Sequence, residues 1–363
     1  MTEQTAYQRS GVDTKAGDIA IELMRQDVQN THKGRVIGGV GGFAGLFDAS
    51  ALRDYRHPVL ATSTDGVGTK IAIAQAMDKH DTIGQDLVAM VIDDIVVVGA
   101  KPLFLTDYIA VGKVHPERIA AIVSGIARAC DEADVAVVGG ETAEHPGILG
   151  VDEYDVAAAV TGVVERDELL GPERVEVGDD VVAVASSGLH SNGYSLVRRI
   201  IADAGIMLTD SVPGISQSVG EVLLEPTLVY ASAMMKVLAD HPGAVHSASH
   251  VTGGGIAQNI QRVMPPGTLL TLERGSWDVP PVFPWLAHHG GFGLDQVEDT
   301  WNLGIGLALI CKAGTAGDVI SSFEASGHSA WVAGTIEKAP EGAVAEAAKG
   351  VSGGIVELRG AWG

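Results

Sequence analysis

The stretch TIGQDLVAMVIDDIVVVGAKPLFLTDYIA, residues 82–110, contains two apolar segments with a glycine and a proline between them. The first, residues 82–98, is long enough for a buried helix. The second, residues 102–110, has the length and the aromatic and β-branched content of a strand. We therefore predict a helix over residues 82–98 that is followed directly by a strand over residues 102–110.

The segments on both sides of this stretch also mix helix and strand patterns. Helical spacing is found in residues 16–29 and 115–133, and the second of these has Pro116 in its first turn, where proline is favoured. Strand patterns are found in residues 58–63, 135–138 and 155–164. Because helices do not separate every pair of strands, an α+β fold is favoured over a doubly wound sheet.

A charged, turn-rich segment at residues 167–180 divides the chain and is interpreted as a linker. A chain of 363 residues exceeds the usual size of a single core, so two domains are expected. We predict an N-terminal domain over residues 1–168, a C-terminal domain over residues 169–340, and a loosely packed Ala/Gly-rich tail over residues 341–363.

The composition excludes several classes of protein. The net charge of −22 argues against binding to nucleic acid or to anionic membranes, which requires a positively charged surface. No apolar run reaches the ~18 residues of a membrane span, and the first residues lack the pattern of a signal peptide, so a cytoplasmic location is expected. Cys130 and Cys311 lie far apart without metal-ligand spacing, and we expect both to be buried thiols.

The segment TDGVGTK, residues 64–70, directly follows the strand predicted over residues 58–63. It combines one carboxylate, two glycines, hydroxyl groups and an amine within a few positions. Taken alone, it is compatible with a polar turn and also with a site that holds a charged ligand.

Three glycine-rich segments could bind phosphate groups. Residues 38–45 do not fit a dinucleotide fingerprint, since no good strand precedes them and no good helix follows, and they are interpreted as a lid over phosphates or as a mobile loop. Residues 138–144, VGGETAE, follow an apolar strand and form either part of a site or a turn with solvated acids. Residues 252–255 place three glycines before a helix, where N–H groups can bind a phosphate.

Asp93 and Asp94 are neighbours within the apolar helix predicted over residues 82–98. Two acids in such a run are unfavourable unless a cation compensates them. Magnesium is one candidate, because it binds one or two carboxylates together with substrate phosphates. A helix N-cap, or an ion pair with Lys70 or Lys101, is the alternative.

His190 lies in the segment SSGLHSNGYS, residues 186–195, among hydroxyl and amide side chains. A single histidine is usually structural. In so polar a loop it can also act as an acid, as a base or as a donor to phosphate, and the residues alone leave these roles open.

Together and in this order, these motifs resemble the phosphoribosylformylglycinamidine cyclo-ligase family of purine biosynthesis. The resemblance extends from about residue 11 to about residue 336. It rests on the segments GGF (41–43), TDGVGTK (64–70), HDTIG (80–84), DLVAM (86–90), GAKPLF (99–104), GGETAE (139–144), HSNGYSLVR (190–198) and HVTGGG (250–255). It implies two mixed-sheet α+β domains, with the N-terminal sheets of two chains joined into a barrel that spans a homodimer.

The resemblance also implies a reaction in which ATP and Mg²⁺ convert formylglycinamidine ribonucleotide to aminoimidazole ribonucleotide, with release of ADP and phosphate. Phosphorylation turns the formyl oxygen into a leaving group, and the amidine nitrogen of the same substrate closes the ring. The implied metal ligands are Asp65 and Asp94. The implied catalytic residues are His190, Lys70 and Asp94.

The other implied site residues contact the nucleotide or the substrate. The nucleotide-binding residues are Gly41, Gly42, Phe43, Gly45, Asp65, Gly66, Gly68, Thr69, Lys70, Asp93, Gly139, Gly140, Glu141 and Thr142. The substrate-binding residues are His190, Ser191, Asn192, Gly193, Thr252, Gly253, Gly254 and Gly255. The chain departs from the family where Asp93 replaces the usual asparagine and Lys101 replaces a common glutamate, two changes of opposite charge.

Proteins with a related ATP-binding architecture are less compatible with the sequence. Selenophosphate synthetase needs a reactive cysteine or selenocysteine near the N-terminus, whereas the first cysteine here is Cys130. Thiamin-phosphate kinase is not expected to carry HSNGYS, residues 190–195. A non-catalytic ATP-binding protein is the alternative from another class, and it would bind ATP without forming ADP from the formylglycinamidine substrate.

Overall fold

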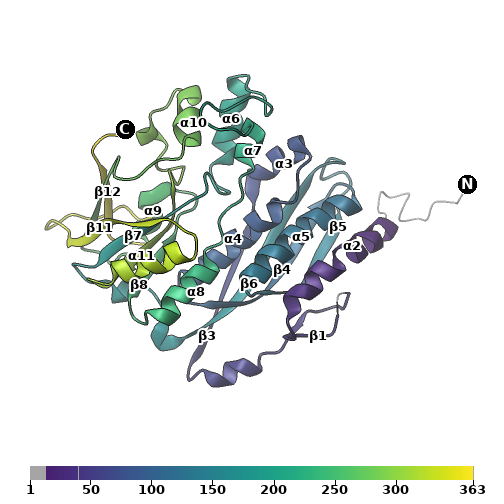
Figure 1. The fold of residues 1–363 in the computed structure, drawn as a ribbon, viewed down its shortest axis with the longest axis horizontal. Helices are drawn as coiled ribbons and strands as arrows, with labels where there is room; N and C mark the ends of the chain where they lie inside the picture. Colours follow the sequence, from purple (N-terminus) through teal and green to yellow (C-terminus); the bar gives the residue numbers. More distant parts are fainter. Residues whose placement is uncertain (1–13, 40, 363) are drawn as a thin grey trace, which may run out of the picture. The chain divides into compact units, whose positions relative to one another are not determined.

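A computed structural model describes residues 14–39 and 41–362 of the chain. The described residues divide into two compact units (Figure 1). The first unit contains the residues up to Ile95 together with Ala100–Arg166, and the second contains Val96–Gly99 and the residues from Asp167 onward. The expected boundary at residues 168/169 lies two positions beyond this division. The segment GVD at residues 11–13 lies outside the described residues.

The first unit contains a four-stranded mixed sheet in the order β3-β6-β4-β5. Its strands are β3 (Pro58–Gly66), β4 (Lys101–Val111), β5 (Ala136–Glu144) and β6 (Tyr154–Glu165). Strand β6 is antiparallel to β3 and to β4, whereas β4 and β5 are parallel. Helix α5 (Pro116–Glu132) makes the long connection that a parallel pair requires.

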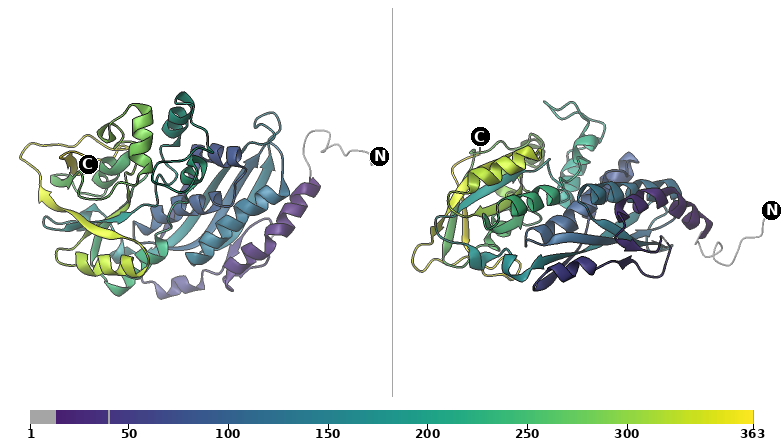
Figure 2. Two further views of the ribbon diagram at one scale, coloured as in Figure 1. Left: turned by 45° about the horizontal axis from the view of Figure 1, so that its top comes forward. Right: turned by 60° about the horizontal axis from the view of Figure 1, so that its bottom comes forward.

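Helices cover one face of this sheet. Helix α2 (Thr14–His32) packs against α5, and both lie on the same side of the strands, next to β5 (Figure 2). Helices α3 (Ile71–Met77) and α4 (Ile83–Val96) also belong to this unit, although α4 extends one residue past its boundary. A short hairpin of β1 (Val36–Ile37) and β2 (Leu46–Phe47) encloses the first glycine-rich segment.

The alternation of residues along β4 explains which face is covered. Leu105 and Ile109 are completely buried, whereas the neighbouring Tyr108 is 43% exposed on the opposite face. Leu60 on β3 is 60% exposed. Side chains alternate between the two faces of a strand, so one face meets the helices and the other is left open. In the described part of the chain β3 and β5 are free edges, and the single chain does not close into a barrel.

The second unit contains a six-stranded sheet in the order β12-β9-β11-β7-β10-β8. Its strands are β7 (Asp180–Ala185), β8 (Val245–His250), β9 (Thr268–Glu273), β10 (Ile305–Cys311), β11 (Ala330–Lys338) and β12 (Ile355–Arg359). Its helices are α6 (Tyr194–Asp203), α7 (Val219–Leu223), α8 (Ala231–Asp240), α9 (Gly255–Gln261), α10 (Val282–Gly290) and α11 (Ala316–Ala325). Every residue of β10 is buried, as its uninterrupted apolar sequence requires.

Short 3₁₀ helices complete the two units at Ser50–Asp54, Gly68–Lys70, Arg166–Glu168, Pro172–Arg174 and Leu294–Gln296. The mixed sheets and packed helices confirm the α+β class. Cys130 and Cys311 are buried thiols, as predicted. Among the described residues, no helix combines the length and the hydropathy that crossing a membrane requires.

Two local predictions were wrong. The segment GGETAE was expected to form a loop beyond the end of the strand, either as part of a site or as a turn, but β5 continues to Glu144, because its residues pair with β4 as far as Val111. The C-terminal tail was expected to pack loosely, but Ile355–Arg359 forms β12 and pairs in parallel with β9. The aromatic rings of Trp277 and Trp362 also meet edge to face, with centroids 5.1 Å apart.

Candidate nucleotide and substrate sites

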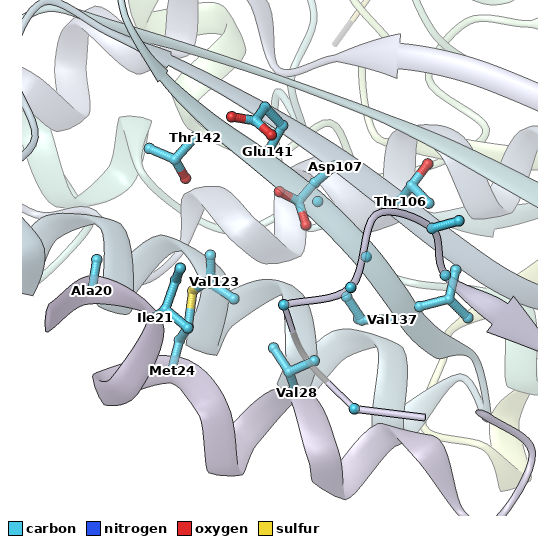
Figure 3. A pocket seen from close by; sticks show the side chains of 18 of the residues that line it. Ala20, Ile21, Met24, Val28, Thr106, Asp107, Val123, Val137, Glu141 and Thr142 are labelled. Atoms are coloured by element: carbon cyan, nitrogen blue, oxygen red, sulfur yellow. The ribbon is translucent and has the colours of Figure 1, made fainter. Parts of the chain in front are cut away.

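A cavity of about 480 Å³ lies in the first unit, between the sheet and helices α2 and α5 (Figure 3). Its helix side is apolar and includes Ile21, Met24 and Val28 from α2. The first glycine-rich segment forms its rim. The central part of β5 forms a further wall, with Glu141 and Thr142 as polar groups.

This cavity brings together residues from two segments that are distant in the sequence. It is lined by Gly41, Gly42, Phe43 and Gly45 from the first segment and by Gly139, Gly140, Glu141 and Thr142 from the second. Gly45 explains how the segments approach so closely, because a Cβ at this position would lie 2.4 Å from the carbonyl oxygen of Val138. Only glycine permits this contact.

Asp107 on β4 also lines the cavity, and the sequence did not single it out. Its carboxyl group points from the sheet into the cavity (Figure 3). The residue is half-buried, since the protein surrounds it except where it opens onto this space. Burial raises its pKa from 3.8 to about 7, because desolvation disfavours the charged form. The signal that could have revealed it is an acid at a helix-facing position between the buried Leu105 and Ile109.

The second group of predicted nucleotide residues does not line this cavity. Asp65 is exposed at the end of β3, and Asp93 is completely buried in α4. Asp94 is half-buried and accepts a hydrogen bond of 3.2 Å from the hydroxyl group of Ser63. The end of β3 and helix α4 are therefore in direct contact near the two predicted metal ligands.

Lys70 is completely buried, and its Nζ lies 2.8 Å from Oδ1 of the equally buried Asp86. The sequence suggested Asp93 or Asp94 as an ionic partner of this lysine, and the structure shows an ion pair with Asp86, which the sequence did not single out. Gly66, Gly68 and Thr69 precede it at the end of β3 and in the following 3₁₀ helix. Gly68 has φ +69°, a left-handed conformation that favours glycine.

The residues at β3 and α4 are compatible with a magnesium ion. Among the described residues, no three His, Cys, Asp or Glu side chains come together as a metal cluster. Magnesium does not need such a cluster, because one or two carboxylates together with phosphates and waters satisfy it. The exposed Asp65 and the half-buried Asp94 carry carboxylate oxygens of the kind that magnesium binds.

In the second unit, His190 is 1% exposed and has φ +57°. Its Nε2 accepts a hydrogen bond of 3.2 Å from the backbone N–H of Ser187, and its ring packs 6.1 Å from that of Tyr230. His190 therefore holds the loop of residues 186–193 together from inside. Ser191 is buried as well, with its hydroxyl 3.1 Å from that of Thr227.

The two predicted substrate segments are adjacent in the fold. A Cβ on Gly253 would lie 3.4 Å from Oδ1 of Asn192. Two positions in these segments require glycine. A Cβ on Gly193 would lie 2.4 Å from the Trp301 ring, and a Cβ on Gly255 would lie 1.9 Å from the carbonyl oxygen of Glu298.

The helix expected after the three glycines is short, since α9 has seven residues. The amide of Asn259 donates to the carbonyl oxygens of Thr252, Gly253 and Gly255. These bonds fix the loop of residues 252–255 from behind. A helix does follow the glycines, as predicted, and the Asn259 side chain braces the loop in front of it.

Comparison with known proteins identifies the family. Residues 47–164 match the N-terminal domain of AIR synthase related proteins, and residues 176–346 match the C-terminal domain. Phosphoribosylformylglycinamidine cyclo-ligase of Geobacillus thermodenitrificans is 46% identical over 332 residues, which cover 91% of this chain and 95% of that protein. The chain belongs to the phosphoribosylformylglycinamidine cyclo-ligase family. The cyclo-ligase of Lachnospira eligens is 42% identical and covers 93% of this chain and 98% of its own.

Solved structures of other proteins share the fold of this chain. A thiamine-monophosphate kinase from Stenotrophomonas maltophilia aligns with a TM-score of 0.67 at 16% identity, covering 93% of this chain and 96% of its own. The hydrogenase maturation protein HypE in complex with ATP aligns with a TM-score of 0.65 at 15% identity, and the alignment covers 96% of this chain and 92% of HypE. At these identities the likeness concerns the fold alone.

Proposed function

We propose that this chain converts formylglycinamidine ribonucleotide to aminoimidazole ribonucleotide, with ATP as co-substrate and ADP and phosphate as further products. Membership of the cyclo-ligase family supports this reaction, because the relatives match the chain over nearly its whole length. The observation that carries it within the structure is the cavity in the first unit, where both glycine-rich segments predicted to bind nucleotide come together.

The reaction needs two steps. The formyl oxygen first attacks the γ-phosphorus of ATP, a new O–P bond forms, and ADP leaves. The amidine nitrogen then attacks the activated carbon, phosphate leaves with the former formyl oxygen, and loss of protons gives the aromatic imidazole ring. Holding the nucleophile and the carbon in one molecule gives the ring closure a large advantage.

The described residues support a division of tasks. The cavity between α2, α5 and the sheet binds the nucleotide, and residues 190–193 and 252–255 bind the ribonucleotide substrate. Asp65 and Asp94 hold Mg²⁺, which supplies positive charge at the phosphates of ATP. Lys70 is a candidate for stabilising the negative charge on the phosphates of ATP. Its ammonium group is buried in an ion pair with Asp86, so it would act on them without being exposed to solvent.

His190 is the candidate acid or base for the substrate. In this structure its side chain braces the loop of residues 186–193, so proton transfer by its imidazole requires the loop to open. The same residue can therefore position the loop or exchange a proton, and the variants described in the Discussion separate the two roles.

We also propose that the protein is a cytoplasmic homodimer in which the open faces of two first-unit sheets meet. Leu60 and Tyr108 are large exposed side chains on this face. A second copy would cover them and join the sheets in a barrel. Size-exclusion chromatography with light scattering tests this, and a monomer at micromolar concentration would count against it.

The reaction is tested with purified protein, ATP, Mg²⁺ and formylglycinamidine ribonucleotide. We expect ADP to form only when all components are present, together with an imidazole product that couples to a diazonium dye. Folded protein that binds ATP but gives no product would overturn the proposal in favour of a non-catalytic ATP-binding protein.

A further inference from the structure

The cavity has the properties of a site for a flat, mostly apolar group that carries a few polar atoms. Its helix side is built mainly from aliphatic side chains, with His32 at the end of α2, and its rim is rich in glycine. Asp107, Glu141 and Thr142 provide the polar side. Binding pockets for small molecules combine an apolar lining with a few placed polar groups in this way. A purine base fits this description better than a triphosphate, because none of the described residues that line the cavity is a lysine or an arginine.

Asp107 is a polar group of the cavity for which residues 14–39 and 41–362 provide no hydrogen-bond or ionic partner. This is so although the residue is half-buried and lines the cavity. Buried polar groups normally have a hydrogen-bond partner. A carboxyl group that opens only onto a cavity is therefore suited to a partner that enters this cavity.

We propose that Asp107 recognises the base of the bound ATP, with its carboxyl group accepting a hydrogen bond from the 6-amino group of adenine and donating one to the adjacent ring nitrogen. This inference rests on the proposed function, because it takes the nucleotide to be ATP. It adds a specificity-determining residue that lies outside both glycine-rich segments.

The chemistry of the two partners agrees. A neutral carboxyl group carries one donor and one acceptor side by side, and adenine presents the 6-amino donor next to a ring-nitrogen acceptor. Burial favours the neutral form of Asp107, since its pKa lies near 7. An asparagine offers the same donor and acceptor, which is why amide side chains pair with adenine.

The sequence around the site supports this placement of the carboxyl group. Gly140 lies directly opposite Asp107 in the β4–β5 register, and it leaves room for the two carboxyl oxygens. On the other sides, the titratable groups nearest the cavity are His32 from α2, Cys130 from α5 and Glu141 from β5. None of them is hydrogen-bonded to Asp107 in the described part of the chain.

The test combines a change in the protein with a change in the base. Calorimetry measures the Kd of ATP and of the triphosphate of purine riboside, which lacks the 6-amino group, each with Mg²⁺. In the wild type we expect about tenfold weaker binding without the amino group, because a buried acceptor is then left unsatisfied. Asp107→Leu should bind both nucleotides within about twofold of each other, whereas Asp107→Asn should keep the preference.

Asp155→Asn serves as the matched control, because this exposed aspartate lies on the neighbouring strand β6 outside the cavity. It should leave both Kd values unchanged. Equal binding of the two nucleotides by the wild type, which needs no variant, would overturn the inference. So would a persistent preference in folded Asp107→Leu.

The same measurements distinguish a failure of the role of Asp107 from a failure of the proposed function. Product formation with ATP, combined with equal affinity for the two nucleotides, would overturn the role of Asp107 alone. Absence of any ATP binding by the wild type would overturn the proposed function and this inference together.

Discussion

The two carboxyl oxygens of Asp107 lie 2.6 and 2.7 Å from the position that a Cβ of Gly140 would occupy. The two residues are direct partners in the parallel β4–β5 pair. A glycine in a sheet often marks a close approach of this kind. Here it allows an acidic side chain to lie flat against β5 and to face the cavity.

Replacement of Gly140 by alanine should therefore displace the Asp107 carboxyl group. We expect Gly140→Ala to lower the free energy of unfolding by about 1–3 kcal/mol, the usual effect of overpacking, and to weaken ATP binding. Urea unfolding and calorimetry measure the two effects. Gly317→Ala is the control, because nothing lies within 4 Å of a Cβ at that helical position. Recovery of stability in Gly140→Ala/Asp107→Ala would identify Asp107 as the obstacle, and no recovery would exclude it.

The stability of the protein should depend on the protonation of Asp107. Its pKa is about 7 in the folded protein, against an ordinary value of 3.8 for the unfolded chain, so between these values the folded state holds a proton that the unfolded state has released. The free energy of unfolding therefore falls as the pH rises through this window, by at most about 1.4 kcal/mol per pH unit. Above about pH 7 this contribution stops changing.

Asp107→Asn removes this titration while His32, Cys130 and Glu141 around the cavity stay the same. We expect the variant to gain stability relative to the wild type between pH 5 and pH 7.5, as measured by urea unfolding in matched buffers. A difference that is constant over this range would mean that the carboxyl group does not titrate there.

The buried pair of Lys70 and Asp86 predicts a large effect on stability. Lys70→Met leaves the Asp86 carboxylate buried without its ammonium partner, and breaking such a pair typically lowers stability by about 3–5 kcal/mol. Lys70→Met/Asp86→Leu should regain most of this loss, since apolar replacements of buried pairs are often neutral. Thermal unfolding compares the variants. If the double variant is stable but inactive, Lys70 also acts on phosphate; full activity would leave it only a structural role.

His190 variants distinguish a catalytic from a positioning role. We expect His190→Ala to lower kcat strongly while the Kd of ATP stays unchanged, because the cavity lies in the other unit. Glutamine places its amide oxygen near the position of Nε2 and can therefore accept from the Ser187 N–H. Recovery of kcat in His190→Gln would assign His190 to positioning, whereas continued loss in a folded protein supports proton transfer.

The metal proposal is tested at Asp94. We expect Asp94→Asn to raise the Mg²⁺ concentration for half-maximal turnover by at least about tenfold, since one anionic ligand is lost. The fold should be retained, because the amide oxygen can still accept the hydrogen bond from Ser63. A magnesium titration and a melting curve measure both effects. An unchanged requirement for Mg²⁺ would remove Asp94 from the metal site.

The order of motifs in the sequence was sufficient to identify the family and the α+β class. The helix predicted over residues 82–98 is α4, Ile83–Val96, and the strand predicted over residues 102–110 is β4, Lys101–Val111. These elements were predictable because hydrophobic periodicity and Gly/Pro punctuation act locally. The glycine-rich segments were recognised for the same reason.

Only the tertiary structure decided which distant segments meet. The pairing of β5 with β4 kept GGETAE in the sheet and placed Asp107 opposite Gly140. The pairing of β12 with β9 turned the apparent tail into a sheet edge. Burial made His190 a brace of its own loop and joined Lys70 to Asp86. The sequence could not specify these outcomes, because strand partners and burial depend on contacts between residues far apart in the chain, whereas composition and spacing report only on neighbours.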